Sequence, residues 1–220
     1  MKLNKYIDHT LLKQDATKGM FDKLCEEAKE YDFKTVCVNP SWIEYCKEKL
    51  RGSDVKVCTV IGFPLGAMTS EAKAFEARQA VELGADEVDM VLNIGRLKNN
   101  EIEYVINDIK KVKEAIGDKV LKVIIETCLL TDEEKLKACD AIIKANADFV
   151  KTSTGFSTSG ANLEDVKLLK KGAKGILKVK AAGGVRSQED MITFIENGAD
   201  RIGTSSGVKL MSNQKPTDSY

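Results

Sequence analysis

The stretch that decides the fold is Gly84-Ala85-Asp86-Glu87-Val88-Asp89-Met90-Val91, where a segment of helical period gives way to a run of apolar residues. The same pattern returns at Asn146-Ala147-Asp148 and at Gly198-Ala199-Asp200, each time ahead of another apolar run. Glycine or asparagine is what a left-handed helix cap requires. Each copy therefore predicts that a helix ends and a strand begins.

Eight such runs are spaced on average about 28 residues apart, which is the length of a βα unit. They are 7–10, 35–39, 57–62, 88–93, 121–126, 149–154, 177–181 and 201–205. Between them, the segment 102–116 carries apolar residues at i, i+3, i+4 and i+7, which predicts a helix with one buried stripe. We therefore expect an α/β fold, a (β/α)8 TIM barrel forming a single domain over residues 1–220. A short mobile tail is expected over about 212–220. The alternative, an open doubly wound sheet, usually carries G-x-G-x-x-G after the first strand, and that motif is not found there.

The charge, apolar runs, cysteines and histidine of the chain argue against several classes of function and binding. The 220 residues hold 34 basic and 34 acidic side chains, so the formal net charge is zero and binding of nucleic acid through overall charge is not expected. No apolar window is long enough for a membrane span, and we expect a cytoplasmic protein. The six cysteines form no C-x-x-C pair, so we expect buried thiols and no disulfides. With His9 as the single histidine, a zinc site built from several imidazoles cannot form within one chain.

Charged residues in the middle of buried strands are the first functional signal. Parallel strands are covered on both faces, so each such charge needs a reason. They are Asp89, Lys122, Lys151, Lys178 and Lys180. In the repeat, Asp89, Lys151 and Gly203 occupy equivalent positions on the fourth, sixth and eighth strands, so they should point into the barrel at one height. Lys180 lies nearer than Lys178 to the carboxyl end, where barrel active sites sit.

Such charges could also be a structural ion pair or snorkelling lysines. Two lysines and one aspartate converging on one mouth favour chemistry, because they leave an excess positive charge at a stability cost. A lysine amine of ordinary pKa, about 10.4, is almost fully protonated at pH 7, and a neighbouring ammonium group or partial burial lowers such a pKa. The free amine can attack a carbonyl to form an imine, whose iminium form accepts electrons from a breaking carbon–carbon bond. The residues thus predict a metal-free Schiff-base lyase or aldolase.

Glycines and hydroxyl side chains gather just after the last three strands. The segments are 152–155, 183–186 and 203–207. Loops after the seventh and eighth strands of a barrel commonly bind phosphate through backbone N–H groups. Each segment alone is a weak motif, because Gly-Gly after a strand is more often a turn. Together they predict a phosphate site.

Seven stretches, in this order along the chain, carry a resemblance to a known family. They are Asp8-His9-Thr10-Leu11-Leu12, Val36-Cys37-Val38-Asn39-Pro40, Gly62-Phe63-Pro64-Leu65-Gly66, Asp86-Glu87-Val88-Asp89-Met90-Val91, Leu121-Lys122-Val123-Ile124-Ile125-Glu126-Thr127, Phe149-Val150-Lys151-Thr152-Ser153-Thr154-Gly155 and Lys180-Ala181-Ala182-Gly183-Gly184-Val185-Arg186. Through them the chain resembles the deoxyribose-phosphate aldolase family along nearly its whole length. The resemblance implies a class I aldolase that reversibly cleaves 2-deoxy-D-ribose 5-phosphate to acetaldehyde and D-glyceraldehyde 3-phosphate. It also implies no metal, no organic cofactor and a homodimer.

The resemblance assigns roles to residues. Lys151 would form the imine, Lys180 would perturb it and move protons, and Asp89 would donate or accept protons. Asp8 and Lys122 would support this polar network. The phosphate cradle would contain Thr154, Gly155, Gly183, Gly184, Ser205 and Ser206.

Other residues and functions stay open at this point. Tyr220, at the end of the tail, is either disordered or an aid to proton transfer; Cys37 is a core residue first, and His9 orients polar neighbours of the first strand. Phe156 follows Gly155 at a position that varies in the family. The rival functions are another Schiff-base barrel aldolase or transaldolase, or a barrel that binds sugar phosphates without catalysis.

Overall fold

The computed structural model describes residues 2–212, in which eight parallel strands form a closed barrel in chain order. The ring closes where Ile7 of the first strand pairs with Ile202 of the eighth. The strands are β1 (Ile7–Leu11), β2 (Thr35–Val38), β3 (Lys56–Ile61), β4 (Glu87–Val91), β5 (Val120–Ile124), β6 (Phe149–Lys151), β7 (Lys178–Ala182) and β8 (Arg201–Thr204). Closure confirms the predicted (β/α)8 class and excludes the open sheet.

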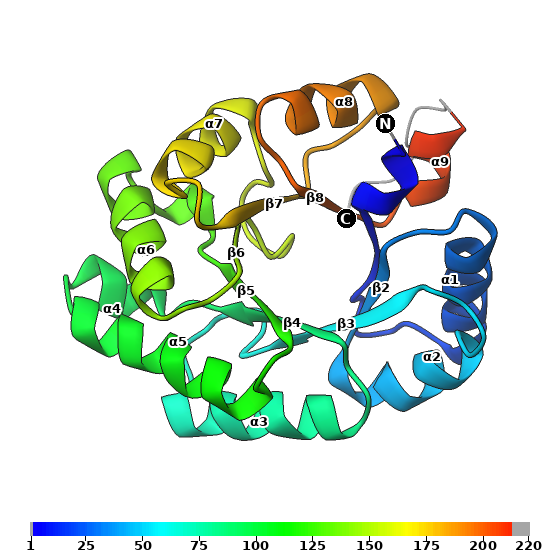
Figure 1. The fold of residues 1–220 in the computed structure, drawn as a ribbon, viewed down its shortest axis with the longest axis horizontal. Coiled ribbons are helices and arrows are strands. Elements are labelled where there is room, and N and C mark those ends of the chain that lie inside the picture. The colour runs from blue at the N-terminus through cyan, green and yellow to red at the C-terminus, as the bar shows by residue number, and fades with distance from the viewer. Residues whose placement is uncertain (1, 213–220) are drawn as a thin grey trace.

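Helices surround the barrel on its outer side (Figure 1). The α-helices are α1 (Lys18–Glu30), α2 (Ile43–Lys49), α3 (Ser70–Glu82), α4 (Ile94–Lys98), α5 (Ile102–Ile116), α6 (Asp132–Lys144), α7 (Leu163–Gly172), α8 (Gln188–Glu196) and α9 (Gly207–Met211). Three 3-10 turns complete the elements: η1 (Leu3–Tyr6), η2 (Pro40–Trp42) and η3 (Thr127–Leu129). Among residues 2–212, none of the helices combines the length and the apolarity needed to cross a bilayer.

The repeated Gly/Asn-Ala-Asp segments lie where a helix passes into a strand, as predicted. Gly84, Asn146 and Gly198 have positive φ angles of 109°, 59° and 113°. Residues without a strong side-chain clash adopt this left-handed backbone most readily, which explains why glycine or asparagine stands there. The turn then directs the chain into β4, β6 or β8.

All eight predicted strands are present, with ends that differ by one to three residues. The largest difference is in β6, which ends at Lys151 although the apolar run suggested Thr154. The backbone N–H of Thr154 donates to the side chain of Glu126 at 3.1 Å. The chain therefore leaves the strand ladder early and forms a loop at the barrel mouth.

Apolar side chains form two separate groups. The larger one fills the space between the barrel and the helices, and the buried stripe of α5 belongs to it, as its helical period predicted. The smaller one lies within the barrel and contains Leu12, Cys37, Cys58 and Val60, with Phe63 packed against it. All six cysteines are free thiols. Residues 213–220, which include Tyr220 and nearly all of the predicted tail, lie outside the described residues, so the single-domain assignment of residues 1–220 stays a prediction.

Candidate active site

Three lysines converge on Asp89 inside the barrel. The Nζ atoms of Lys151 and Lys180 lie 2.9 and 2.8 Å from Asp89 Oδ2, and Lys122 Nζ lies 2.8 Å from Oδ1. These side chains come from β4, β5, β6 and β7, and the parallel register places Lys151 beside Lys180. The structure thus brings together four of the five charges that the sequence placed in mid-strand. Lys178 is the exception, because it opens β7 and is exposed.

A second set of charges lies next to this cluster. Asp8 Oδ2 is 2.6 Å from Lys180 Nζ, and Glu87 Oε2 is 2.6 Å from Lys122 Nζ. Arg201 joins the two carboxylates, because its Nε donates to Asp8 at 2.9 Å and its Nη2 to Glu87 at 3.0 Å. The network therefore spans β1, β4, β5, β6, β7 and β8.

The carboxylates of this network are held ionised by their cationic neighbours. Burial alone would raise the pKa of Asp89, but the positive charges of Lys122, Lys151 and Lys180 outweigh it and hold that pKa well below its usual value. Burial likewise opposes ionisation of Asp8, whose pKa is nevertheless lowered by Arg201 and Lys180. Glu87 behaves in the same way, so each carboxylate accepts hydrogen bonds as an anion.

Two of the lysines are held protonated. Burial would lower the pKa of Lys180, but the carboxylates of Asp8 and Asp89 raise it well above the ordinary value. For Lys122, burial is outweighed by the carboxylates of Asp89 and Glu87, and the pKa is again raised. Both side chains are fully buried, whereas Lys151 retains 3% exposure.

The charge count corrects one expectation from sequence. Two ammonium groups beside one aspartate would leave an uncompensated positive charge, but Asp8 and Glu87 bring two further carboxylates. The three carboxylates of Asp8, Glu87 and Asp89 balance the three cations Lys122, Lys180 and Arg201. Lys151 is the additional group, hydrogen-bonded to Asp89 at 2.9 Å.

The apolar group within the barrel faces this network through two thiols. Ligand atoms of Cys37, Cys58 and Asp89 lie within 4.8 Å of one another, which is close enough to ask whether they hold a metal. Lys122 Nζ, however, lies 3.4 Å from Cys58 Sγ, and Asp89 already accepts hydrogen bonds from three lysine side chains, of which Lys122 and Lys180 are held as cations. A further cation would be repelled, so this donor set does not suit a metal ion. Cys37 itself is fully buried, as a core residue should be.

Gly203 lies beside the charged network, whereas His9 lies outside it. A Cβ atom on Gly203 would lie 3.1 Å from Lys180 Cε, which places Gly203 beside the lysines as the repeat predicted. His9 does not join the network. Its Nε2 lies 2.7 Å from Glu27 Oε2 of α1, and its ring packs against Phe33.

The glycines predicted to bind phosphate lie at the carboxyl ends of β6 and β7. Gly155, Gly183 and Gly184 all have positive φ angles, of 88°, 70° and 78°. A Cβ on Gly184 would lie only 2.2 Å from the carbonyl oxygen of Ala161, so the close packing of these loops requires glycine there.

The hydroxyl residues of the predicted cradle have different surroundings. Ser205 is exposed and Ser206 half-buried, and the Ser206 N–H donates to Thr204 Oγ1 at 3.0 Å. Thr154 is buried, and both its N–H and its hydroxyl donate to Glu126. The structure thus leaves the two serines accessible to a ligand and engages Thr154 within the protein.

Sequence reasoning missed three charged residues of this region. Glu87 lies two residues before Asp89, so the period of a strand places both on one face. Arg201 opens β8 and could have been found by the same argument as the mid-strand lysines. Glu126 lies in a turn, and nothing in its sequence neighbours predicts its contact with Thr154.

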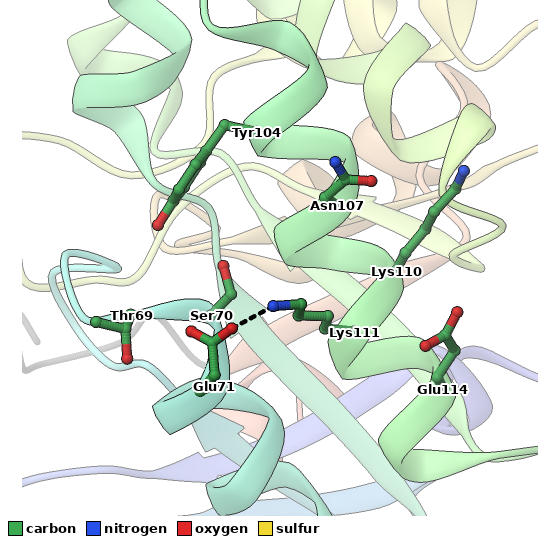
Figure 2. A pocket seen from close by; sticks show the side chains of 8 residues that line it. All are labelled: Thr69, Ser70, Glu71, Tyr104, Asn107, Lys110, Lys111 and Glu114. Atoms are coloured by element: carbon green, nitrogen blue, oxygen red, sulfur yellow. Dashed lines mark hydrogen bonds and ion pairs between the residues drawn. The ribbon is translucent and has the colours of Figure 1, made fainter.

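A separate groove of about 650 Å3 lies on the outer surface between α3 and α5 (Figure 2). An ion pair between Glu71 and Lys111 crosses it. Its other lining residues are polar or aromatic, and none of the residues predicted from sequence is among them. The chemistry therefore belongs to the barrel interior.

A closed parallel barrel whose mouth carries an amine hydrogen-bonded to a buried carboxylate defines the class of lysine-dependent barrel aldolases. A family model described as DeoC/LacD family aldolase matches residues 2–212, and the chain belongs to that family. Similar curated relatives are the deoxyribose-phosphate aldolases of Streptococcus uberis and Streptococcus gordonii, each 60% identical over 220 residues and covering all of both chains. A solved deoxyribose phosphate aldolase from Aeropyrum pernix, described as tetrameric, is 37% identical, with a TM-score of 0.85 over 96% of this chain and 89% of that one.

Proposed function

We propose that this protein is a class I aldolase that reversibly cleaves 2-deoxy-D-ribose 5-phosphate to acetaldehyde and D-glyceraldehyde 3-phosphate. The observation that carries the proposal is the placement of Lys151. Its amine is 2.9 Å from a buried carboxylate, and among the three converging lysines it alone keeps any exposure, 3% against 0% for Lys122 and Lys180. The family and the full-length relatives favour the same reaction and the same substrate.

The reaction begins when Lys151 Nζ attacks C1 of the open-chain sugar. The carbinolamine loses water to give an iminium ion that links C1 to the lysine nitrogen. The uncharged amine is the form that attacks the carbonyl carbon.

Carbon–carbon cleavage follows from the iminium ion. Removal of the proton from the C3 hydroxyl breaks the C2–C3 bond, the electron pair moves into the iminium, and glyceraldehyde 3-phosphate leaves. The remaining enamine is protonated at C2, and water hydrolyses the resulting iminium to acetaldehyde and the free amine of Lys151.

Proton transfer falls mainly to Lys180. Its raised pKa makes it an ammonium group at rest. It protonates the departing hydroxyl of the carbinolamine, takes up the C3 hydroxyl proton through water and then returns that proton to C2 of the enamine. Asp89 has a strongly lowered pKa, so in the resting site it orients Lys151 and Lys180 by accepting their hydrogen bonds. Asp8 and Lys122 fix the charge and the position of these two groups.

The phosphate end of the sugar is proposed to lie against the loops after β6, β7 and β8. The backbone around Gly155, Gly183 and Gly184, with Ser205 and Ser206, supplies neutral donors there. Holding the remote phosphate fixes the reacting carbons against Lys151, so its binding energy contributes to orientation.

The proposal is tested by incubating the protein with 2-deoxy-D-ribose 5-phosphate and measuring release of glyceraldehyde 3-phosphate with a coupled dehydrogenase. Wild type should release it, and Lys151→Arg, which keeps a positive charge but cannot form the imine, should not. Turnover only with ketone donors would point to a transaldolase-like enzyme. Binding of the sugar phosphate without release would point to a non-catalytic barrel.

Assembly and location extend the same proposal. We infer a homodimer in the cytoplasm that binds neither nucleic acid nor membranes, as the resemblance and the neutral net charge favour. Light scattering of the purified protein measures the assembly. A tetramer, the state named for the Aeropyrum pernix structure, is the outcome that would replace the dimer.

A further inference from the structure

Glu126 is a buried acidic residue at the barrel mouth that the proposed mechanism does not use. It lies between β5 and η3 and is 3% exposed. Its backbone is left-handed, with φ 52° and ψ 68°, which is an unfavourable conformation for a residue with a side chain. Such strain persists where surrounding contacts hold the residue in place.

The contacts that hold Glu126 come from the loop after β6. The Thr154 N–H donates to Oε1 at 3.1 Å, and the Thr154 hydroxyl donates to Oε2. The same Thr154 oxygen accepts the N–H of Phe156 at 3.0 Å. The carboxylate thus holds Thr154 directly, and the Thr154 hydroxyl in turn holds the backbone at Phe156, on the other side of Gly155.

This arrangement changes the role expected for Thr154. A phosphate oxygen could accept hydrogen bonds from the N–H and the hydroxyl of Thr154. The carboxylate of Glu126 already accepts both of these hydrogen bonds. A phosphate group could take them only by displacing a buried carboxylate. The donors left for phosphate are therefore those of the neighbouring backbone and of the exposed serine loop after β8.

Resting on the proposed function, we propose that Glu126 is a positioning residue for phosphate binding. It holds Thr154, and through Thr154 it sets the loop that carries Gly155. Thr154 acts through this link and is not itself a phosphate ligand. Removing either partner leaves a buried hydrogen-bonding group unsatisfied, so the loop should lose its shape.

A double-mutant cycle tests the link with Glu126→Ala, Thr154→Val and the combined variant. Each single change should raise KM for 2-deoxy-D-ribose 5-phosphate about tenfold or more, with kcat within about twofold. The combined variant should match Glu126→Ala, because that change already removes both bonds between the carboxylate and Thr154. Turnover of unphosphorylated 2-deoxyribose should be unchanged in all three.

Controls separate positioning from general damage. Glu126→Gln keeps an acceptor oxygen and should restore most of the affinity, and it replaces the alanine variant if that variant does not fold. Glu133→Ala removes the same charge from an exposed side chain of α6 and should match wild type. If Thr154→Val raises KM a further tenfold in the Glu126→Ala background, Thr154 contacts phosphate directly and the inference is wrong.

Calorimetric titration with inorganic phosphate gives a second reading that needs no turnover. Glu126→Ala and the combined variant should bind phosphate equally weakly, about tenfold below wild type. Absence of glyceraldehyde 3-phosphate release by wild type would count against the proposed reaction. Equal phosphate binding by wild type and Glu126→Ala would count against the positioning role.

Discussion

Asp89 accepts hydrogen bonds from three lysine side chains, so its replacement should affect both chemistry and stability. In Asp89→Asn the side-chain nitrogen cannot accept, and Lys180 loses one of its two carboxylate partners. We expect kcat to fall by about 10²–10⁴-fold and the free energy of unfolding to fall by about 3 kcal/mol. Steady-state kinetics and urea unfolding measure the two effects. The exposed change Asp118→Asn should alter neither, and a fully active Asp89→Asn would contradict the network.

Gly203 leaves the space that Lys180 occupies. In Gly203→Ala the new Cβ would lie 3.1 Å from Lys180 Cε and 3.2 Å from Ala182 Cβ, so the lysine must move. Displacing a group in the site by a fraction of an ångström should lower kcat by on the order of 10- to 100-fold. Gly19→Ala in α1, where a Cβ meets nothing within 4 Å, is the matched control and should keep full activity. Equal kinetics of the two variants would show that Gly203 does not shape the site.

For individual residues, the sequence predicted which strands carry buried charges but not which of these charges pair with one another. The spacing of Asp89 and Lys151 from the repeated helix ends was enough to place both inside the barrel at one height. Arg201 and Glu87 were missed because each stands at the start of a strand, where a charge is ordinarily solvent-exposed. Their mutual contact depends on the closure of β8 against β1 and on side chains 114 residues apart.

The helices α3 and α5 are joined to β4 by a buried ion pair. Lys73 Nζ lies 2.6 Å from Asp108 Oδ2 and donates to the carbonyl of Val91 at 2.9 Å, and both charged side chains are at most 1% exposed. Asp108→Ala would leave a buried ammonium group without its carboxylate. We expect the free energy of unfolding to fall by about 3–5 kcal/mol. Glu114→Ala, on the exposed side of the same helix, is the control for urea unfolding and should stay close to wild type.

A fall of less than 1 kcal/mol in the free energy of unfolding of Asp108→Ala would contradict this account of the ion pair.

The sequence predicted α5 from its apolar period, yet it did not indicate that Asp108 lies on the buried side. The burial of that residue follows from the position of Lys73 on the neighbouring helix. The apolar period therefore predicts where a helix lies and which of its faces is buried. Whether a charged residue can also lie on the buried face depends on the neighbouring helix that supplies its partner.

The whole barrel carries carboxylates whose pKa values are lowered on folding, and this predicts how stability depends on pH. Asp8, Glu87 and Asp89 stay ionised in the folded state, whereas in the unfolded chain they take up protons near their ordinary pKa values of 3.8 and 4.5. Their stabilising contribution is therefore present above about pH 4.5 and is lost as the pH falls further. Each contributes at most about 1.4 kcal/mol per pH unit to the slope.

Urea unfolding between pH 2 and pH 5 measures this slope. Asp8→Asn should reduce it, because one carboxylate fewer takes up a proton on unfolding. The variant will also be less stable at neutral pH, so the comparison is made on slopes and not on absolute values. Identical slopes for wild type and variant would show that Asp8 is not held ionised by Arg201 and Lys180.

For the whole molecule, eight regularly spaced runs and three copies of one helix-to-strand segment were sufficient to predict the closed barrel. The boundary of β6 was not predictable, because Thr154 leaves the ladder for a carboxylate supplied by the loop after β5. The division of the barrel interior into a charged side and an apolar side was also not evident. It arises from the register of strands that are far apart in the chain.

The identity of the amine that forms the imine is tested most directly by borohydride reduction in the presence of acetaldehyde, followed by peptide mass mapping. One ethyl group should appear on the peptide that contains Lys151, and Lys151→Arg should carry none. An ethyl group on Lys180 or Lys122, or no adduct in an active wild-type protein, would contradict the role given to Lys151.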